Sequence, residues 1–115
     1  MSDEPHFRTG RRQPVELRVR YRRDDAEAAM EYVGRTSDLG LGGAFIEADK
    51  TPPAGANIVV VLTSPTAWEP LEIPAEVRWV KDGSDGPRGF GVRFRALRGA
   101  DATALQQLIH ACDFE

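Results

Sequence analysis

Alternation between apolar and polar positions runs through much of the chain and predicts β-strands. In residues 14–21 every second residue is apolar, namely Val15, Leu17, Val19 and Tyr21. Residues 71–79 repeat the pattern with Leu71, Ile73, Ala75, Val77 and Trp79. A period of two residues is typical of a strand with one core face and one solvated face. Pro74 falls on the outward set of the second segment and predicts an edge position or a bulge there.

Four further segments have strand character: residues 28–35, 44–47, 57–62 and 90–94. Residues 57–62 contain an unbroken β-branched run, which predicts a strand covered on both faces. Phe90, Val92 and Phe94 alternate with Gly91 and Arg93, which predicts one buried face for the last strand. Charged or Pro- and Gly-containing segments separate the strands and predict a turn at 22–25 and loops at 49–55, 63–70 and 81–88.

The C-terminal residues change to a helical period. Asp101 is placed as an N-cap, and the apolar positions that follow recur at helical spacing: Ala104, Leu105, Leu108, Ile109 and Cys112. We expect this stripe to lie over an end of the sheet. Six short strands followed by one helix predict a mainly β fold, a small six-stranded antiparallel barrel with a C-terminal α-helix.

A glycine-rich turn separates the second and third predicted strands. Residues 36–47 contain Gly40, Gly42 and Gly43 within four positions, with Asp38 at the mouth of the turn. Such glycines indicate backbone that turns tightly or allows close approach by another group. Two interpretations stay open for Asp38 from the local pattern: an Asx-type residue that caps nearby N–H groups, or an acceptor for a bound molecule.

Composition places the chain among ordinary globular proteins. Its 115 residues are 41% hydrophobic and 29% charged, enough for one domain with a substantial core. The N-terminus lacks the basic and apolar regions of a signal peptide, and no apolar run is long enough to span a membrane. Cys112 is the single cysteine and excludes an internal disulfide. We therefore expect a cytoplasmic protein without membrane insertion.

Charge is distributed unevenly along the chain. Residues 1–23 hold seven arginines against three acids, a local balance of +4, whereas the other residues hold eight basic and fifteen acidic side chains, a balance of −7. An arginine-only head on an acidic domain suggests a local anion site more than a nucleic-acid track. Arginine also forms forked hydrogen bonds to phosphate or a guanine edge, which lysine cannot. A solvated basic arm is the alternative interpretation.

No catalytic constellation stands out in the sequence. His6 lies in the polar N-terminal segment and His110 in the predicted helix, and neither has a partner at motif spacing. Ser37, Ser64 and Ser84 belong to no nucleophile motif, and no phosphate-binding loop is present. We expect a binding module that is not an enzyme and holds no metal or cofactor.

Two motifs together resemble the PilZ domain family, bacterial receptors for the second messenger cyclic di-GMP. Residues 8–12, Arg-Thr-Gly-Arg-Arg, match the family's Arg-x-x-x-Arg arm before the first strand. Residues 38–43, Asp-Leu-Gly-Leu-Gly-Gly, match the family's Asp/Asn-x-Ser-x-x-Gly at Asp38 and Gly43. The similarity continues through residues 76–79 and 89–94. It implies a flexible arm at residues 1–12 and one barrel domain at residues 13–115.

The resemblance also implies a ligand and a set of binding residues. Arg8 and Arg12 would clamp phosphates and guanine edges, and Arg11 would assist by stacking. Asp38 would accept hydrogen bonds from guanine, and Gly43 would keep the backbone close to the ligand. The arm would order on cyclic di-GMP and so regulate a protein partner.

Position 40 departs from the family pattern. Gly40 replaces the usual serine, so a hydroxyl that would contact the ligand is missing. A hydrogen bond to a charged group contributes roughly 1.5–3 kcal/mol, so the replacement predicts weaker binding. The alternative function is a degenerate adaptor that keeps the fold, binds another protein and has lost cyclic di-GMP. Nucleic-acid binding through the arm ranks last, because Phe7 is the sole aromatic residue beside the arginines.

Overall fold

The computed structural model describes residues 16–24, 30–63, 70–84, 86–95, 97 and 99–113, with side chains of the helix described as far as His110. The described part contains six strands and one helix, as the hydrophobic pattern predicts. Their bounds are β1 (Arg18–Arg23), β2 (Tyr32–Leu39), β3 (Gly43–Glu47), β4 (Asn57–Leu62), β5 (Leu71–Lys81), β6 (Gly89–Phe94) and α1 (Gly99–Asp113).

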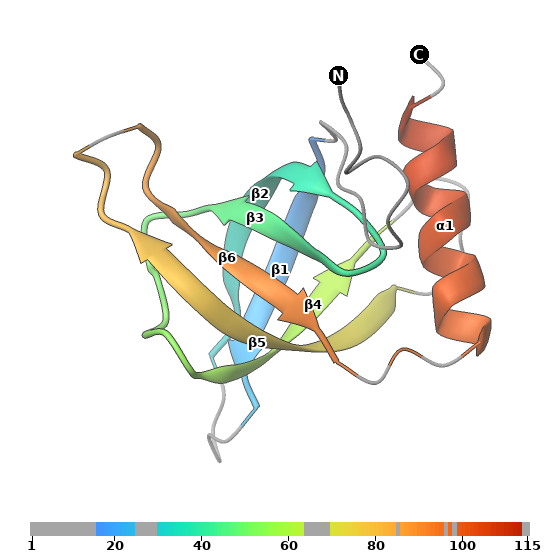
Figure 1. Cartoon of the computed structure of the whole chain (residues 1–115), viewed down its shortest axis with the longest axis horizontal. Coiled ribbons are helices and arrows are strands. Elements are labelled where there is room, and N and C mark those ends of the chain that lie inside the picture. The colour runs from blue at the N-terminus through green and yellow to red at the C-terminus, as the bar shows by residue number, and fades with distance from the viewer. Residues whose placement is uncertain are drawn as a thin grey trace, which may run out of the picture.

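The six strands form a closed antiparallel barrel in the order β1-β2-β3-β6-β5-β4 (Figure 1). Closure comes from β1, which pairs with β2 on one side and with β4 on the other. Every strand therefore has a neighbour on both sides, and no long edge is left to pair with another chain. The predicted fold class, a six-stranded barrel with a C-terminal helix, is confirmed.

The barrel interior is filled by the inward residues of all six strands. They are Val19, Tyr21, Leu39, Ala44, Ile46, Ile58, Val60, Leu62, Ile73, Ala75, Val77, Phe90, Val92 and Phe94. The α1 residues Leu105, Leu108 and Ile109 join this cluster. The helix thus covers one end of the barrel with its apolar stripe, as expected, and contacts β5 (Figure 1).

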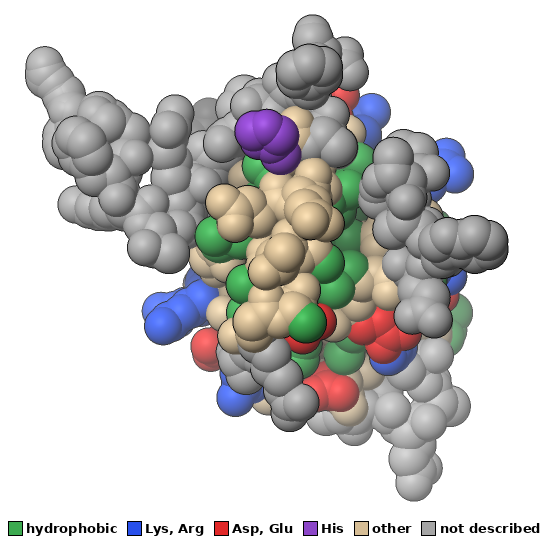
Figure 2. Space-filling view, turned by 90° about the vertical axis from the view of Figure 1, so that its right-hand side faces the viewer, with side chains coloured by type: hydrophobic (Ala, Val, Ile, Leu, Met, Phe, Trp, Pro, Cys, Tyr) green, Lys and Arg blue, Asp and Glu red, His purple; other side chains and the backbone are tan. Residues whose placement is uncertain are grey.

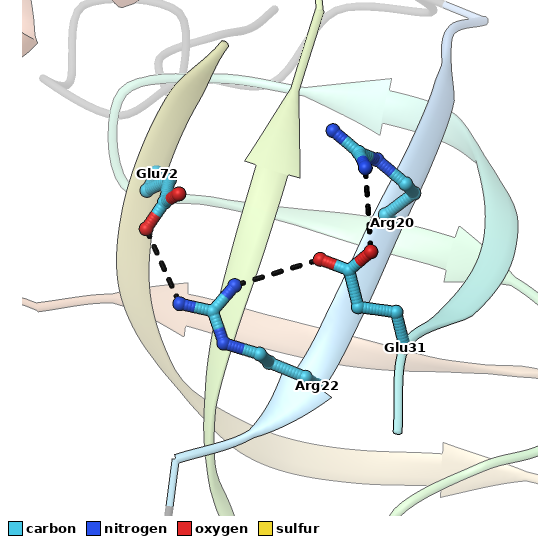
Figure 3. A network of polar contacts seen from close by, with 4 residues as sticks. All are labelled: Arg20, Arg22, Glu31 and Glu72. Atoms are coloured by element: carbon cyan, nitrogen blue, oxygen red, sulfur yellow. Dashed lines mark hydrogen bonds and ion pairs between the residues drawn. The ribbon is translucent and has the colours of Figure 1, made fainter. Parts of the chain in front are cut away.

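Strand β4 is buried on both faces, as its β-branched run predicts. Its outward residues Val59 and Val61 are 8% and 2% exposed. Arg22 lies opposite Val59 and forms ion pairs with Glu31 at 3.6 Å and with Glu72 at 3.2 Å, so its side chain crosses over β4 (Figure 3). The long aliphatic stem of such an arginine covers apolar surface while its charged end stays in water.

Two strand boundaries differ from the prediction. Arg22 and Arg23, assigned to a turn, belong to β1, because Val59 and Ile58 of β4 pair with them. Strand β2 begins at Tyr32 and runs to Leu39, whereas the sequence predicted 28–35. The first strand was expected from residue 14; residues 14 and 15 lie outside the described part, and β1 starts at Arg18.

Trp79 was predicted to point into the core, and this is wrong. A β-bulge between Val77 and Trp79 shifts the register by one residue and turns Trp79 to the outer face, where it is 42% exposed. Its ring stacks on Phe45 with centroids 6.5 Å apart. The pattern predicted an edge position or a bulge at Pro74. The bulge lies after Val77 instead, and Pro74 pairs with Val59 of β4 but lies just beyond the β5–β6 ladder, which starts at Ala75.

Two glycines of β6 form the floor beneath these aromatic rings. A Cβ on Gly91 would lie 2.2 Å from the Trp79 ring, and a Cβ on Gly89 would lie 2.3 Å from the Ile46 carbonyl oxygen and 2.9 Å from the Phe45 ring. The pattern Gly-x-Gly in β6 therefore permits both the close β3–β6 approach and the flat packing of the rings.

The helix also differs in two details. It begins at Gly99, so Asp101 lies inside the first turn instead of at the N-cap, where its charge still favours the positive end of the helix. Ala104 is exposed, so the buried stripe is narrower than predicted, and the Cys112 side chain lies outside the described part. Figure 2 looks onto this side of the molecule, and the exposed α1 positions 103, 104, 106 and 107 carry no ionisable side chain.

Substitution of Gly89 tests whether the close approach of β3 and β6 requires a glycine. Gly89→Ala places a methyl group against backbone in the β3–β6 ladder, so we expect a loss of unfolding free energy of at least about 2 kcal/mol. Gly99→Ala is the matched control, because nothing lies within 4 Å of its Cβ position and it sits in a helix. It should leave stability unchanged or raise it. Urea unfolding measures both; equal behaviour of the two variants would contradict the packing argument.

The ionisation of Tyr21 predicts how the free energy of unfolding depends on pH. Burial, followed by the proximity of Tyr32 and Asp49, raises its pKa from 10.0 to about 12. As the pH rises, the unfolded chain therefore loses this proton before the folded chain does. The contribution of the protonated hydroxyl to the free energy of unfolding is complete below pH 10.0 and is lost progressively as the pH rises to about 12. The chain has two tyrosines. Tyr21→Phe should remove this part of the pH dependence of unfolding, and tyrosinate absorbance should show one ionisation fewer at high pH.

Candidate functional site

The glycine-rich stretch forms the hairpin between β2 and β3. The Gly40 N–H donates to the Gly43 carbonyl at 2.9 Å, which leaves Leu41 and Gly42 at the tip. The Gly42 carbonyl accepts from the Phe94 N–H at 2.9 Å, so the hairpin is fixed against the end of β6. Gly40 and Gly43 are buried. The predicted tight turn is confirmed at the end of the barrel that α1 covers.

Asp38 lies in β2, two residues before the hairpin, and not in the turn itself. A register shift between Thr36 and Asp38 marks a β-bulge, after which Asp38 pairs with Phe45. Its Oδ1 accepts the Phe45 N–H at 3.1 Å. The N–H that it accepts belongs to the facing strand β3 and not to the turn, where an Asx-type residue would find its donor.

Thr36 fixes the segment that leads into β1. Its side chain is 0% exposed, its Oγ1 accepts the Leu17 N–H at 2.9 Å, and its own N–H donates to the Leu17 carbonyl at 2.8 Å. Because β1 and β2 are antiparallel, the chain approaches β1 from the barrel end that holds Asp38 and the hairpin. The sequence analysis did not single out Thr36, since a threonine in a strand carries no signal of such a role.

The structure brings together three of the six predicted site residues. Asp38, Gly40 and Gly43 share one hairpin. The other three, Arg8, Arg11 and Arg12, lie outside the described residues. Arg93 of β6 pairs with Gly43 and is exposed, so it brings a positive charge to this hairpin that the sequence analysis did not assign.

Neither a metal site nor a membrane-spanning helix is found in the part of the chain that the structure describes. Within it, no three His, Cys, Asp or Glu side chains are grouped so that they could hold a metal ion. The described helix is not long and apolar enough to cross a bilayer.

Comparison with known proteins adds a family and a set of similar folds. The family model described as the PilZ domain matches residues 6–111. No curated protein matches the sequence.

Three solved structures show the similarity of fold. The PilZ domain of CeSA from a cellulose-synthesising bacterium has a TM-score of 0.67 at 16% identity, covering 90% of this chain and 98% of that one. The inhibitor of motility MotI/DgrA from Bacillus subtilis has a TM-score of 0.69 at 16% identity, with 90% and 50% covered, so this chain spans half its length. The PilZ domain of YcgR from Escherichia coli, with c-di-GMP, has a TM-score of 0.62 at 15% identity, with 86% and 90% covered.

The contact between Leu17 and Thr36 gives a test of how the N-terminal segment is held. Thr36→Val removes the acceptor and leaves the partly buried Leu17 N–H without it, which costs up to about 3 kcal/mol. Amide hydrogen exchange at Leu17 should accelerate accordingly. Thr36→Ser keeps the hydroxyl and is the matched control, so Leu17 should stay protected. Equal protection in Thr36→Val and the parent chain would show that this bond does not hold the segment.

Proposed function

The chain belongs to the PilZ domain family, and we propose that it is a receptor for cyclic di-GMP. The ligand would bind at the β2–β3 hairpin, between Asp38 and the arginines of residues 8–12. Ordering of the N-terminal arm on the ligand would create or hide a surface for a protein partner.

The observation that carries this proposal is the pairing of Leu17 with Thr36. It directs the segment before β1 toward the Asp38 end of the barrel. Arg12 precedes Leu17 by five residues, and an extended chain spans roughly 3.3–3.6 Å per residue, so its backbone stays within about 18 Å of this anchor. The guanidinium groups of Arg8 and Arg12 can therefore reach the hairpin.

The residue chemistry fits a guanine dinucleotide. Cyclic di-GMP carries two phosphate charges, which an otherwise acidic chain would repel without the arginines. Arg8 and Arg12 would form forked hydrogen bonds to phosphates and guanine edges, and Arg11 would stack on a base. Asp38 would accept from guanine N1–H and the exocyclic amine. Gly43 would allow the backbone to approach the ligand.

The comparisons support the same ligand. The fold resembles that of the YcgR PilZ domain, which was solved with c-di-GMP, and the longer YcgR structure with c-di-GMP has a TM-score of 0.67 over 93% of this chain. PilZ domains are regulatory binding modules. We therefore propose a cytoplasmic, non-catalytic regulator, with residues 1–12 as the arm and residues 13–115 as the domain.

Gly40 supports a second candidate function. It stands where the family has serine, so one ligand hydrogen bond is missing. A chain that had lost more of its affinity would keep the barrel and act as an adaptor for another protein. The two functions differ in a single measurable property, which is binding of cyclic di-GMP at physiological ligand concentration.

Isothermal titration with cyclic di-GMP distinguishes them. We expect saturable heat at a protein concentration of about 100 μM. Arg12→Ala and Asp38→Ala should each raise the Kd by about ten- to 150-fold, the value of one charged hydrogen bond. Arg78→Ala is the matched control, because Arg78 is exposed and forms a weak ion pair with Glu76 at 3.8 Å.

Two results would overturn the receptor function. Absence of heat in the folded parent chain would favour the adaptor. Equal affinities for Arg12→Ala and Arg78→Ala would show that the arm does not hold the ligand.

A further inference from the structure

A cavity lies at the end of the barrel opposite α1. It has a volume of about 450 Å³, and its lining includes Tyr21, Arg23, Tyr32, Lys50 and Arg88. These residues come from the end of β1, the start of β2, the β3–β4 loop and the residue before β6, which lie on the side of the barrel away from α1 (Figure 1). A volume of this size is within the range of small-molecule sites. We call it the distal cavity.

The distal cavity is separate from the hairpin site. Tyr32 is the first residue of β2 and lines the cavity, whereas Asp38 and Leu39 end that strand at the hairpin. Eight residues of strand span roughly 24 Å from first to last. A ligand in one site therefore cannot contact the other.

The charge of the distal cavity is opposite to that of the chain. Of the described residues that line it, Arg23, Lys50 and Arg88 are basic and Asp49 is acidic, a balance of +2. The whole chain has a net charge of −3. A phosphomonoester carries about −1.5 to −2 at neutral pH, so its charge complements that of the cavity. Arginine and lysine are the side chains that bind such groups.

Hydrogen bonds hold the backbone around these cations. The Tyr21 hydroxyl donates to the Lys50 carbonyl, and the Arg88 carbonyl accepts the Ala48 N–H at 3.1 Å. Arg23 is half-buried in β1 opposite Ile58 of β4. The backbone of the segments that carry the three charges is therefore fixed around one cavity, while the side chains of Lys50 and Arg88 are exposed and accessible to a ligand.

Two tyrosine rings, those of Tyr21 and Tyr32, line the cavity together with the basic residues. The half-buried Tyr32 ring lies 5.7 Å from the buried Tyr21 ring, which in turn packs on Phe90 at 5.0 Å. This stack keeps Tyr32 in place, with part of its surface in the cavity. A planar group attached to a phosphate would pack on that ring.

We propose that the distal cavity binds a small phosphomonoester with a planar group, such as a mononucleotide. Arg23, Lys50 and Arg88 hold the phosphate, and Tyr32 contacts the planar group. This site is independent of cyclic di-GMP binding at the hairpin.

Amide chemical shifts of the full chain test this proposal with guanosine 5′-monophosphate as the probe. We expect saturable shifts at Lys50, Thr51 and Arg88. Ribose 5-phosphate should move the same signals with lower affinity, because it lacks the planar group, and guanosine should not move them. Equal shifts with guanosine would overturn phosphate recognition, and equal affinity for the two phosphates would overturn the role of Tyr32.

Variants separate the two sites. Arg88→Gln and Lys50→Gln should each weaken binding of the probe at least about tenfold, whereas Arg78→Gln, an exposed arginine outside the cavity, should not. Asp38→Ala should leave the shifts at Lys50 and Arg88 unchanged while it impairs cyclic di-GMP binding. Absence of saturation in the parent chain, or equal affinities for Arg88→Gln and Arg78→Gln, would overturn the proposal even if the hairpin binds cyclic di-GMP.

Discussion

Pairing of β1 with both β2 and β4 is the constraint on which the structure depends. It closes the barrel, and it fixes which ends of the strands meet. Because β1 begins beside the end of β2, Leu17 and the glycine hairpin lie at one end of the barrel. Because β1 ends beside the start of β2, Arg23 and Tyr32 meet at the other end. Both proposed sites follow from this one arrangement.

Most of the fold could be predicted from the sequence, since the strands alternate cleanly and the glycine- and proline-containing segments mark their ends. The errors arose where an interaction distant in sequence decides the local structure. Arg22 and Arg23 have the composition of a turn, yet pairing with β4 extends the strand through them. Trp79 continues a perfect alternation, yet the bulge after Val77 reverses its direction. No local pattern contains either partner strand.

The candidate site was predictable to a smaller extent. The glycines could be assigned to one turn from their spacing, because neighbours in sequence are also neighbours in space, whereas Asp38, expected at the mouth of that turn, lies in β2. The bulge that positions Asp38, the anchor at Thr36 and the position of Arg93 opposite Gly43 required the pairing of strands. The distal cavity is the extreme case, because its three basic residues come from positions 23, 50 and 88 and form no motif in the sequence.

The separation of the two sites limits how they can influence each other. They lie roughly 24 Å apart along β2, whereas charges are screened over about 8 Å at physiological ionic strength. Direct electrostatic coupling between a dinucleotide at the hairpin and an anion in the distal cavity is therefore small. Coupling would have to pass along the strands that run between the two ends, such as β2, which carries both Tyr32 and Asp38. A closed, fully paired barrel resists such displacement, so the two ends of the molecule are best understood as independent binding surfaces on one rigid scaffold.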